Sequence, residues 1–191
     1  YLRQERHDKG LAMAMPDLTP YKPDGQKIAY LTFDDGPDNK NTPAVLDILK
    51  ANGIHATFYV TGQMAQENPA VLKRIFAEGH AIGNHSYDHN YKRLYKSKED
   101  FLADMQQSEE IIFNILGVRP LIIRAPGGTV GMFGNDFYEA VNLAGYVPHD
   151  WNVSTEDATA KRPNASQEVQ FVDRMTKGRL KDDMALVLMH S

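Results

Sequence analysis

The chain has 191 residues, of which 42% are hydrophobic and 24% are charged, and its formal net charge is −4. This length suffices for one well-buried core, and the mild acidic excess lacks the clustered Lys and Arg of a nucleic-acid surface. Cysteine is absent, which excludes disulfide scaffolds, thiolate metal sites and cysteine nucleophiles. No apolar run reaches the roughly 18 residues that span a membrane, and the first residues lack the apolar segment of a signal peptide.

The N-terminal part of the chain differs in composition from the rest. Residues 1–27 combine charges and Ala-Met repeats with several proline and glycine residues, which predicts an arm or linker. Residues 28–191 are expected to form one catalytic domain. Because the chain ends directly after a strand-like run, this domain is expected to lack its last packing helix.

Strand-like apolar runs alternate with amphipathic helical segments along this domain. Strands are predicted at residues 28–33, 56–60, 81–84, 121–124, 146–153 and 185–189. Helices are predicted at residues 42–52, 69–78, 97–116, 135–143 and 166–177, with Thr42 and Ser97 as N-caps. The alternation implies parallel strands with right-handed crossovers, and a barrel is favoured because polar residues follow the strand ends.

Residues with catalytic side chains stand where these strands end. They are Asp34 and Asp35 on the first strand, followed by His85, His89, Arg124, Asp157 and His190. The carboxyl ends of parallel strands share one edge of a sheet or barrel, so these side chains are expected to converge. Asp34 and Asp35 could alternatively cap the following helix, which the pair alone does not exclude.

His85 and His89 are four residues apart, a spacing that suits Zn²⁺ and that would place both rings on one face if the segment is helical. An added carboxylate completes a His₂-Asp set that leaves a coordination position open for water, as in catalytic zinc sites. Metal binding would lower the pKa of that water to about 7. A neighbouring carboxylate kept ionised by an arginine could act as base, and a histidine on the opposite wall as acid.

Four segments resemble motifs of one known family. They are Thr32-Phe33-Asp34-Asp35-Gly36-Pro37 with Thr42, His85-Ser86-x-x-His89, Arg124-x-Pro126-x-Gly128, and Leu188-Met189-His190. In this order they resemble four of the five motifs of the NodB-like polysaccharide deacetylases, carbohydrate esterase family 4, of the peptidoglycan N-acetylglucosamine deacetylase type. The resemblance implies an incomplete or distorted (β/α)₇ barrel and metal-dependent hydrolysis of the N-acetyl group of a sugar.

The resemblance also implies roles for single residues. Asp34 matches the general base, Arg124 its charged partner and His190 the general acid. The matching metal ligands are Asp35, His85 and His89, and the substrate-binding positions are Pro126, Gly127 and Leu188. The backbone N–H of Gly127 would stabilise the tetrahedral oxyanion, and Leu188 would form part of the acetyl pocket.

The remaining motif, Asp-x-x-Asp-Trp, is the fourth in the family's order and is degraded here to Ser154-Thr155-Glu156-Asp157-Ala158. Asp157 is favoured as the partner of His190 over Asp150, which would lie inside a strand. Ala158 replaces a tryptophan, and Gly127 stands where many relatives carry an aromatic residue. The loss of two bulky groups predicts a wider groove, while Trp151 and Tyr146 are predicted to be core residues.

The hypothesis that follows is a secreted or surface-displayed bacterial enzyme that deacetylates N-acetylglucosamine of peptidoglycan. Chitin oligosaccharides, N-acetylmuramic acid and acetylxylan are alternative substrates, and a non-catalytic glycan-binding module is the alternative from another class. A phosphoesterase would require more basic residues near the site. Zn²⁺ is the expected cofactor, with Co²⁺, Ni²⁺ or Fe²⁺ as alternatives because a His₂-Asp site accepts all of them.

Overall fold

The computed structural model describes residues 27–160, 163–177 and 184–191. Its strands are β1 (Ile28–Asp34), β2 (Thr57–Val60), β3 (Ala81–Asn84), β4 (Ile122–Ile123), β5 (Val147–Pro148), β6 (Val153–Ser154) and β7 (Met184–His190). Its helices are α2 (Asn41–Asn52), α3 (Gly62–Glu67), α4 (Pro69–Ala77), α5 (Tyr91–Leu94), α6 (Lys98–Leu116), α7 (Asn135–Leu143) and α8 (Ala165–Thr176). The predicted arm, residues 1–27, lies outside the described residues apart from Lys27.

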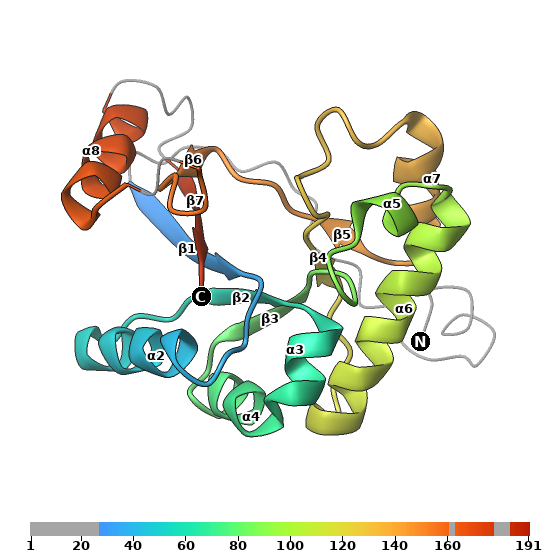
Figure 1. Cartoon of the computed structure of the whole chain (residues 1–191), viewed down its shortest axis with the longest axis horizontal. Coiled ribbons are helices and arrows are strands. Elements are labelled where there is room, and N and C mark those ends of the chain that lie inside the picture. Colours follow the sequence, from blue (N-terminus) through green and yellow to red (C-terminus); the bar gives the residue numbers. More distant parts are fainter. Residues whose placement is uncertain (1–26, 161–162, 178–183) are drawn as a thin grey trace.

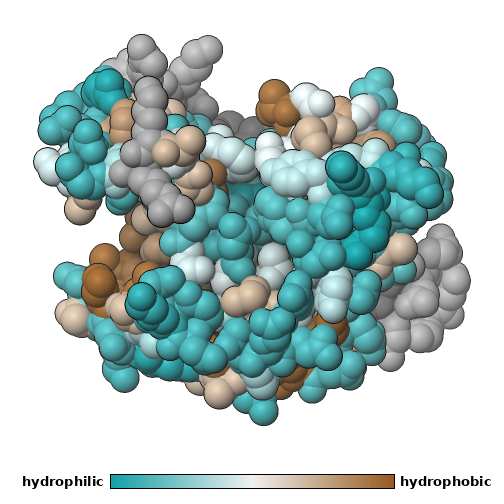
Figure 2. Space-filling view, viewed as in Figure 1, coloured by the Kyte–Doolittle hydropathy of each residue, from teal (hydrophilic) through white to brown (hydrophobic). Residues whose placement is uncertain are grey.

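All strand pairs in the sheet are parallel, in the order β5-β4-β3-β2-β1-β7-β6. Helices surround the sheet, with α2, α3 and α4 along one side and α5, α6 and α7 along another (Figure 1). Hydrophilic residues dominate the face shown in Figure 2, where apolar residues form small separate patches. Within the described residues, no helix combines the length and the apolar character that crossing a membrane requires.

A short connection forces the sheet to curl. β5 and β6 form its two opposite edges, yet only residues 149–152 separate them. Five Cα steps span at most about 18 Å, whereas the edges of a flat seven-stranded sheet would lie about 29 Å apart. The sheet is therefore the curled, distorted (β/α)₇ barrel that the sequence predicts.

The predicted strand at residues 146–153 is wrong as one continuous strand. Val147 and Pro148 pair with β4, while Val153 and Ser154 pair with β7. His149 still donates its N–H to the carbonyl of Ile123 in β4, and Asn152 donates its N–H to the carbonyl of Leu186 in β7. Between these bonds the chain crosses from one edge to the other, and the carbonyl oxygens of His149 and Asp150 accept hydrogen bonds from the Arg124 guanidinium. This crossing segment, residues 149–152, brings both sheet edges to the same charged side chain.

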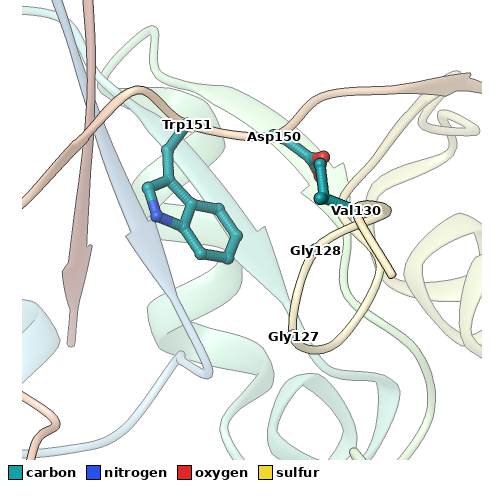
Figure 3. Close-up of a pocket in the computed structure, with 5 residues that line it drawn as sticks. All are labelled: Gly127, Gly128, Val130, Asp150 and Trp151. Carbon is teal, nitrogen blue, oxygen red and sulfur yellow. The ribbon is translucent and has the colours of Figure 1, made fainter. Parts of the chain in front are cut away.

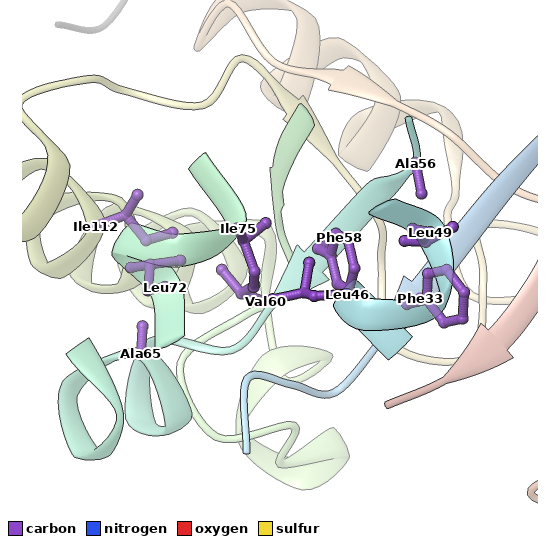
Figure 4. Close-up of a cluster of buried hydrophobic side chains, with 10 residues drawn as sticks. All are labelled: Phe33, Leu46, Leu49, Ala56, Phe58, Val60, Ala65, Leu72, Ile75 and Ile112. Atoms are coloured by element: carbon purple, nitrogen blue, oxygen red, sulfur yellow. The ribbon is translucent and has the colours of Figure 1, made fainter. Parts of the chain in front are cut away.

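The largest apolar cluster packs one face of the sheet against α2, α3, α4 and α6 (Figure 4). The Phe33 and Phe58 rings of the adjacent strands β1 and β2 stack with their centroids 5.1 Å apart. Leu46 of α2 and Leu72 of α4 are fully buried in the same cluster. The core thus fixes the central strands whose carboxyl ends carry the predicted site.

The start of α2 differs from the prediction. The helix begins at Asn41, and the carboxylate of Asp38 accepts the backbone N–H groups of Lys40, Asn41 and Thr42. Thr42 is buried in the first turn, where its hydroxyl accepts the N–H of Asp38. A carboxylate does cap this helix, but it belongs to Asp38, which leaves Asp34 and Asp35 free for other contacts. The predicted cap of α6 is confirmed, since Ser97 accepts the N–H of Asp100.

Gly83 in β3 leaves room for the ring of Tyr59. A methyl group at Gly83 would lie 2.3 and 2.5 Å from two ring carbons of Tyr59, whose other face lies 4.1 Å from the Arg124 guanidinium. We expect Gly83→Ala to lower the free energy of unfolding by about 1–3 kcal/mol, because the buried ring cannot move away without displacing Arg124. Urea denaturation measures this. Ala81→Ser, at the exposed start of the same strand, should change stability by less than about 0.5 kcal/mol, and equal effects would contradict the prediction.

Candidate active site

The end of β1 places two carboxylates at the centre of the sheet edge. Asp34 lies between β2 and β7, in register with Tyr59 and His190, and is 2% exposed. Asp35 has φ +71°, in the left-handed region that non-glycine residues rarely adopt. This conformation ends the strand and leaves the Asp35 carboxylate about half-exposed. The two adjacent residues therefore occupy different environments, one buried and one open to a ligand.

His85 and His89 come together through a tight loop, and not through the shared helical face that their spacing would give in a helix. Residues 85–90 are not helical, and Ser86 and His89 have φ values of +71° and +58°. The Ser86 hydroxyl accepts the N–H of His89 at 3.0 Å, and the Asn84 side chain accepts the N–H of Ser86. Two N–H groups at the start of α3 donate to loop carbonyls, which holds the loop in this conformation.

Asp35, His85 and His89 form the one group in the described chain whose side chains could hold a metal ion together. Asp35 Oδ1 lies 3.4 Å from His85 Nε2 and 3.7 Å from His89 Nε2. Ligand atoms about 2.1 Å from a tetrahedral ion lie about 3.4 Å apart, so these spacings fit. The buried Oδ1 atom of Asp35 has no hydrogen-bond partner among the described residues. His85 Nδ1 donates to the carbonyl of Arg124 at 2.7 Å, which leaves its Nε2 lone pair free to bind a metal.

Arg124 is fully buried and paired with Asp34. Its Nη1 donates to Asp34 Oδ1 and to the Thr32 hydroxyl, both at 2.7 Å. The guanidinium lies 4.1 Å from the centre of the Tyr59 ring and 5.6 Å from that of Trp151. Burial raises the pKa of Asp34 above that of an ordinary carboxyl group, and the charges of His85 and Arg124 oppose the increase. A carboxylate with a raised pKa is a stronger base at neutral pH.

The structure places Asp157, and not Asp150, beside His190. Asp157 Oδ1 accepts a hydrogen bond from His190 Nδ1 at 2.8 Å, and Oδ2 accepts the backbone N–H of His190 at 2.8 Å. This leaves His190 Nε2 available to the site. The hydrogen bond to Asp157 raises the pKa of His190, and burial opposes the increase. Asp150 instead accepts hydrogen bonds from the N–H and hydroxyl of Thr129.

The predicted substrate-binding residues flank this centre. Leu188 lies two residues before His190 on β7, so both side chains face the same side of the sheet. Pro126 and Gly127 form the turn after β4, with φ +78° at Gly127. A pocket of about 210 Å³ opens beside this turn, lined by Gly127, Gly128, Val130, Asp150 and Trp151 (Figure 3).

Two aromatic rings at the site were missed by the sequence analysis. Trp151 lines the pocket, so its prediction as a core residue is wrong, whereas Tyr146 is buried as predicted. A methyl group at Gly128 would lie 3.2 Å from the Trp151 ring, and one at Gly127 would lie 3.0 Å from the Tyr91 hydroxyl. Tyr91 and Trp151 therefore occupy the space beside these two glycines, while the wider groove expected from Gly127 and Ala158 together stays a prediction. Local sequence could not reveal this, because each ring meets its glycine only through the fold.

The chain matches known proteins in sequence and structure. The family model for polysaccharide deacetylase matches residues 21–149. A peptidoglycan-N-acetylglucosamine deacetylase of Bacillus cereus is 34% identical over 166 residues, which cover 86% of this chain and 60% of that protein. The peptidoglycan-N-acetylmuramic acid deacetylase PdaC of Bacillus subtilis is 36% identical over 149 residues, covering 78% of this chain and 32% of that protein.

A solved structure of a Streptococcus mutans CE4 esterase superposes with a TM-score of 0.80 at 31% identity, covering 86% of this chain and 74% of that one. The chain thus spans about a third to three fifths of the two matched deacetylases and most of this structural neighbour. The family match covers about two thirds of the chain and includes the segments that carry Asp34, His85 and Arg124. The chain therefore belongs to the polysaccharide deacetylase family.

Proposed function

We propose that this protein is a metal-dependent hydrolase that removes N-acetyl groups from N-acetylglucosamine residues of peptidoglycan. The observation that carries the proposal is the convergence of the His₂-Asp group, the Asp34–Arg124 pair and the Asp157–His190 pair at one sheet edge. The names of its relatives support peptidoglycan as the substrate. Such a substrate implies action outside the cell or at the cell surface.

Asp35, His85 and His89 would hold a divalent ion, with Zn²⁺ the expected one and Co²⁺, Ni²⁺ and Fe²⁺ as alternatives. When bound, such an ion polarises the acyl carbonyl as a Lewis acid and lowers the pKa of a water molecule. The donor set of two imidazoles and one carboxylate is typical of catalytic zinc sites rather than structural ones.

The remaining groups would supply the proton transfers and the oxyanion contact of amide hydrolysis. Asp34, whose Oδ2 lies 3.7 Å from His85 Nε2, would take the proton from the attacking water. The N–H of Gly127 would donate to the oxyanion that develops on the acyl carbonyl. His190, held in one tautomer by Asp157, would donate a proton from Nε2 to the departing amine, which breaks the C–N bond.

N-acetylmuramic acid is the second candidate substrate within the same chemistry, because PdaC, 36% identical, is named for it. A non-catalytic glycan-binding module is the alternative of another class. The buried Asp34–Arg124 pair speaks against it, since glycan binding alone gives no reason to bury a charged base beside the metal ligands.

Metal dependence is tested first. We expect metal-stripped protein to release no acetate from N-acetylglucosamine oligomers or peptidoglycan, and added Zn²⁺ or Co²⁺ to restore release.

Metal binding is also measured by thermal unfolding. At 100 times the dissociation constant, Zn²⁺ should raise the melting temperature by roughly 5–10 °C. His89→Ala should abolish this shift because it removes one of the three metal ligands. The variant should still fold, because the ring is one-third exposed and its removal costs little packing. His55→Ala, at an exposed histidine with one carbonyl contact, is the control. Acetate release by stripped protein would contradict the proposal.

The Asp34→Asn variant distinguishes the deacetylase proposal from the non-catalytic glycan-binding module. The amide keeps the shape of the side chain but cannot take a proton, so kcat should fall by about 10²–10⁴-fold while Zn²⁺ binding, measured by calorimetry, persists. Asp47→Asn, at an exposed carboxylate paired with Arg74, is the matched control and should retain full activity. A wild-type protein that binds glycan without releasing acetate, and whose affinity survives Asp34→Asn, would support the binding module instead.

The pH profile tests the Asp157–His190 pair. His190 must be protonated to act as an acid, so activity should fall as the pH rises through its pKa. The hydrogen bond to Asp157 raises that pKa, and Asp157→Asn should therefore shift the alkaline limb of log kcat to lower pH. Asp173→Asn, at an exposed residue of α8, should leave the profile unchanged. An unshifted alkaline limb in Asp157→Asn would show that His190 is not the acid.

A further inference from the structure

Three kinds of contact hold the short helix α5 beside the active site. Leu94 is fully buried, and Arg93 forms ion pairs with Asp88 and Asp104. The Tyr95 hydroxyl donates to the carbonyl of Pro126 at 2.6 Å, which joins the helix to the turn after β4. The first residue of α5, Tyr91, is therefore held in a set position relative to that turn. A side chain that is positioned before a ligand arrives loses less conformational entropy on binding.

Tyr91 lies between the metal ligands and the glycine turn. Its ring centroid is 5.2 Å from that of His89, and the two rings are tilted by 73°. On the other side, its hydroxyl would be 3.0 Å from a methyl group at Gly127. The Tyr91 ring also lies beside that of Tyr95, with the centroids 6.0 Å apart. The residue is nevertheless 44% exposed, and its hydroxyl has no hydrogen-bond partner among the described residues. The exposed part of the ring and the hydroxyl are therefore available to a ligand beside the site.

The exposure of the side chains at the site indicates which part of a substrate would contact the Tyr91 ring. His85 and the proposed base Asp34 are each 2% exposed, whereas the side chains of Asp35 and His89 are 47% and 33% exposed. The acyl group must reach the buried groups, whereas the pyranose ring that bears it would remain among the exposed side chains. Tyr91, 44% exposed and packed against the partly exposed ring of His89, is one of these exposed side chains.

We propose that Tyr91 binds the sugar whose acyl group is removed, with the exposed face of its ring packed against the apolar face of the pyranose. Its hydroxyl is then free to bond to a sugar hydroxyl. This inference rests on the proposed deacetylase function and identifies a residue that contacts substrate from α5, outside the recognised motifs. Aromatic side chains suit this role because they bring a large apolar area with only two rotatable bonds.

The test compares Tyr91→Ala and Tyr91→Phe with wild-type protein loaded with Zn²⁺, using an N-acetylglucosamine tetramer. Tyr91→Ala should raise KM by about tenfold and change kcat by less than about twofold, because the chemical groups remain in place. Tyr91→Phe keeps the ring and should change KM by less than about threefold. Tyr30→Ala, at a tyrosine of β1 with nearly the same exposure, 47%, is the matched control and should behave as wild type. Zn²⁺ affinity is measured in parallel for every variant.

Each alternative result contradicts the inference in a distinguishable way. An active wild-type enzyme with unchanged KM in Tyr91→Ala would overturn the sugar contact and leave the deacetylase function intact. A fall in kcat accompanied by weaker Zn²⁺ binding would show that Tyr91 supports His89 and does not bind sugar. If wild-type protein releases no acetate from any glycan, the proposed function and this inference fail together.

Discussion

The buried ion pair between Arg124 and Asp34 is the interaction on which the site depends. Both side chains are almost inaccessible to solvent, so each charge has lost its hydration and is stabilised by the other. The guanidinium also bonds to Thr32 and to the crossing segment, and the carbonyl of Arg124 accepts from the metal-site residue His85. One residue thus ties β1, β4 and the segment that closes the barrel to the metal group. Truncating either side chain would remove both the charge and its hydrogen bonds and would loosen these elements, whereas an amide at position 34 keeps an oxygen that can accept from Arg124.

Backbone strain is concentrated around the same centre. Asp35, Ser86 and His89 all have positive φ values, a conformation that costs roughly 1–3 kcal/mol for each non-glycine residue. Hydrogen bonds offset this cost in the loop that carries the histidines. The side chains of Asn84 and Ser86 accept backbone N–H groups of the loop, and the N–H groups at the start of α3 donate to loop carbonyls. These conformations bring the ligand atoms of Asp35, His85 and His89 within 4.8 Å of one another. A framework that holds the three ligands in place favours metal binding, because it limits the conformational entropy that binding costs.

The sequence predicted the strands with strong periodicity and clear boundaries, and failed where distant contacts override local signals. The strand predicted at residues 146–153 is divided where Arg124, far away in the chain, donates hydrogen bonds to the carbonyl oxygens of His149 and Asp150. The histidine spacing would bring both rings to one face only if the segment were helical, and a strained loop achieves the same proximity instead. The preference for Asp157 over Asp150 beside His190 came from its place after the strand, and the structure puts Asp157 there.

By itself the sequence determined the class of fold, the family and the set of polar residues at the strand ends. It could do so because strand and helix periodicity and the spacing of the motifs are local properties. Only the tertiary structure decided how the barrel closes, which carboxylate faces which histidine, and which aromatic rings border the site. Tyr91 and Trp151 illustrate the reason: their partners Gly127 and Gly128 are brought to them by the packing of α5 and by the crossing segment. Contacts between elements far apart in the chain leave no periodic trace in either segment.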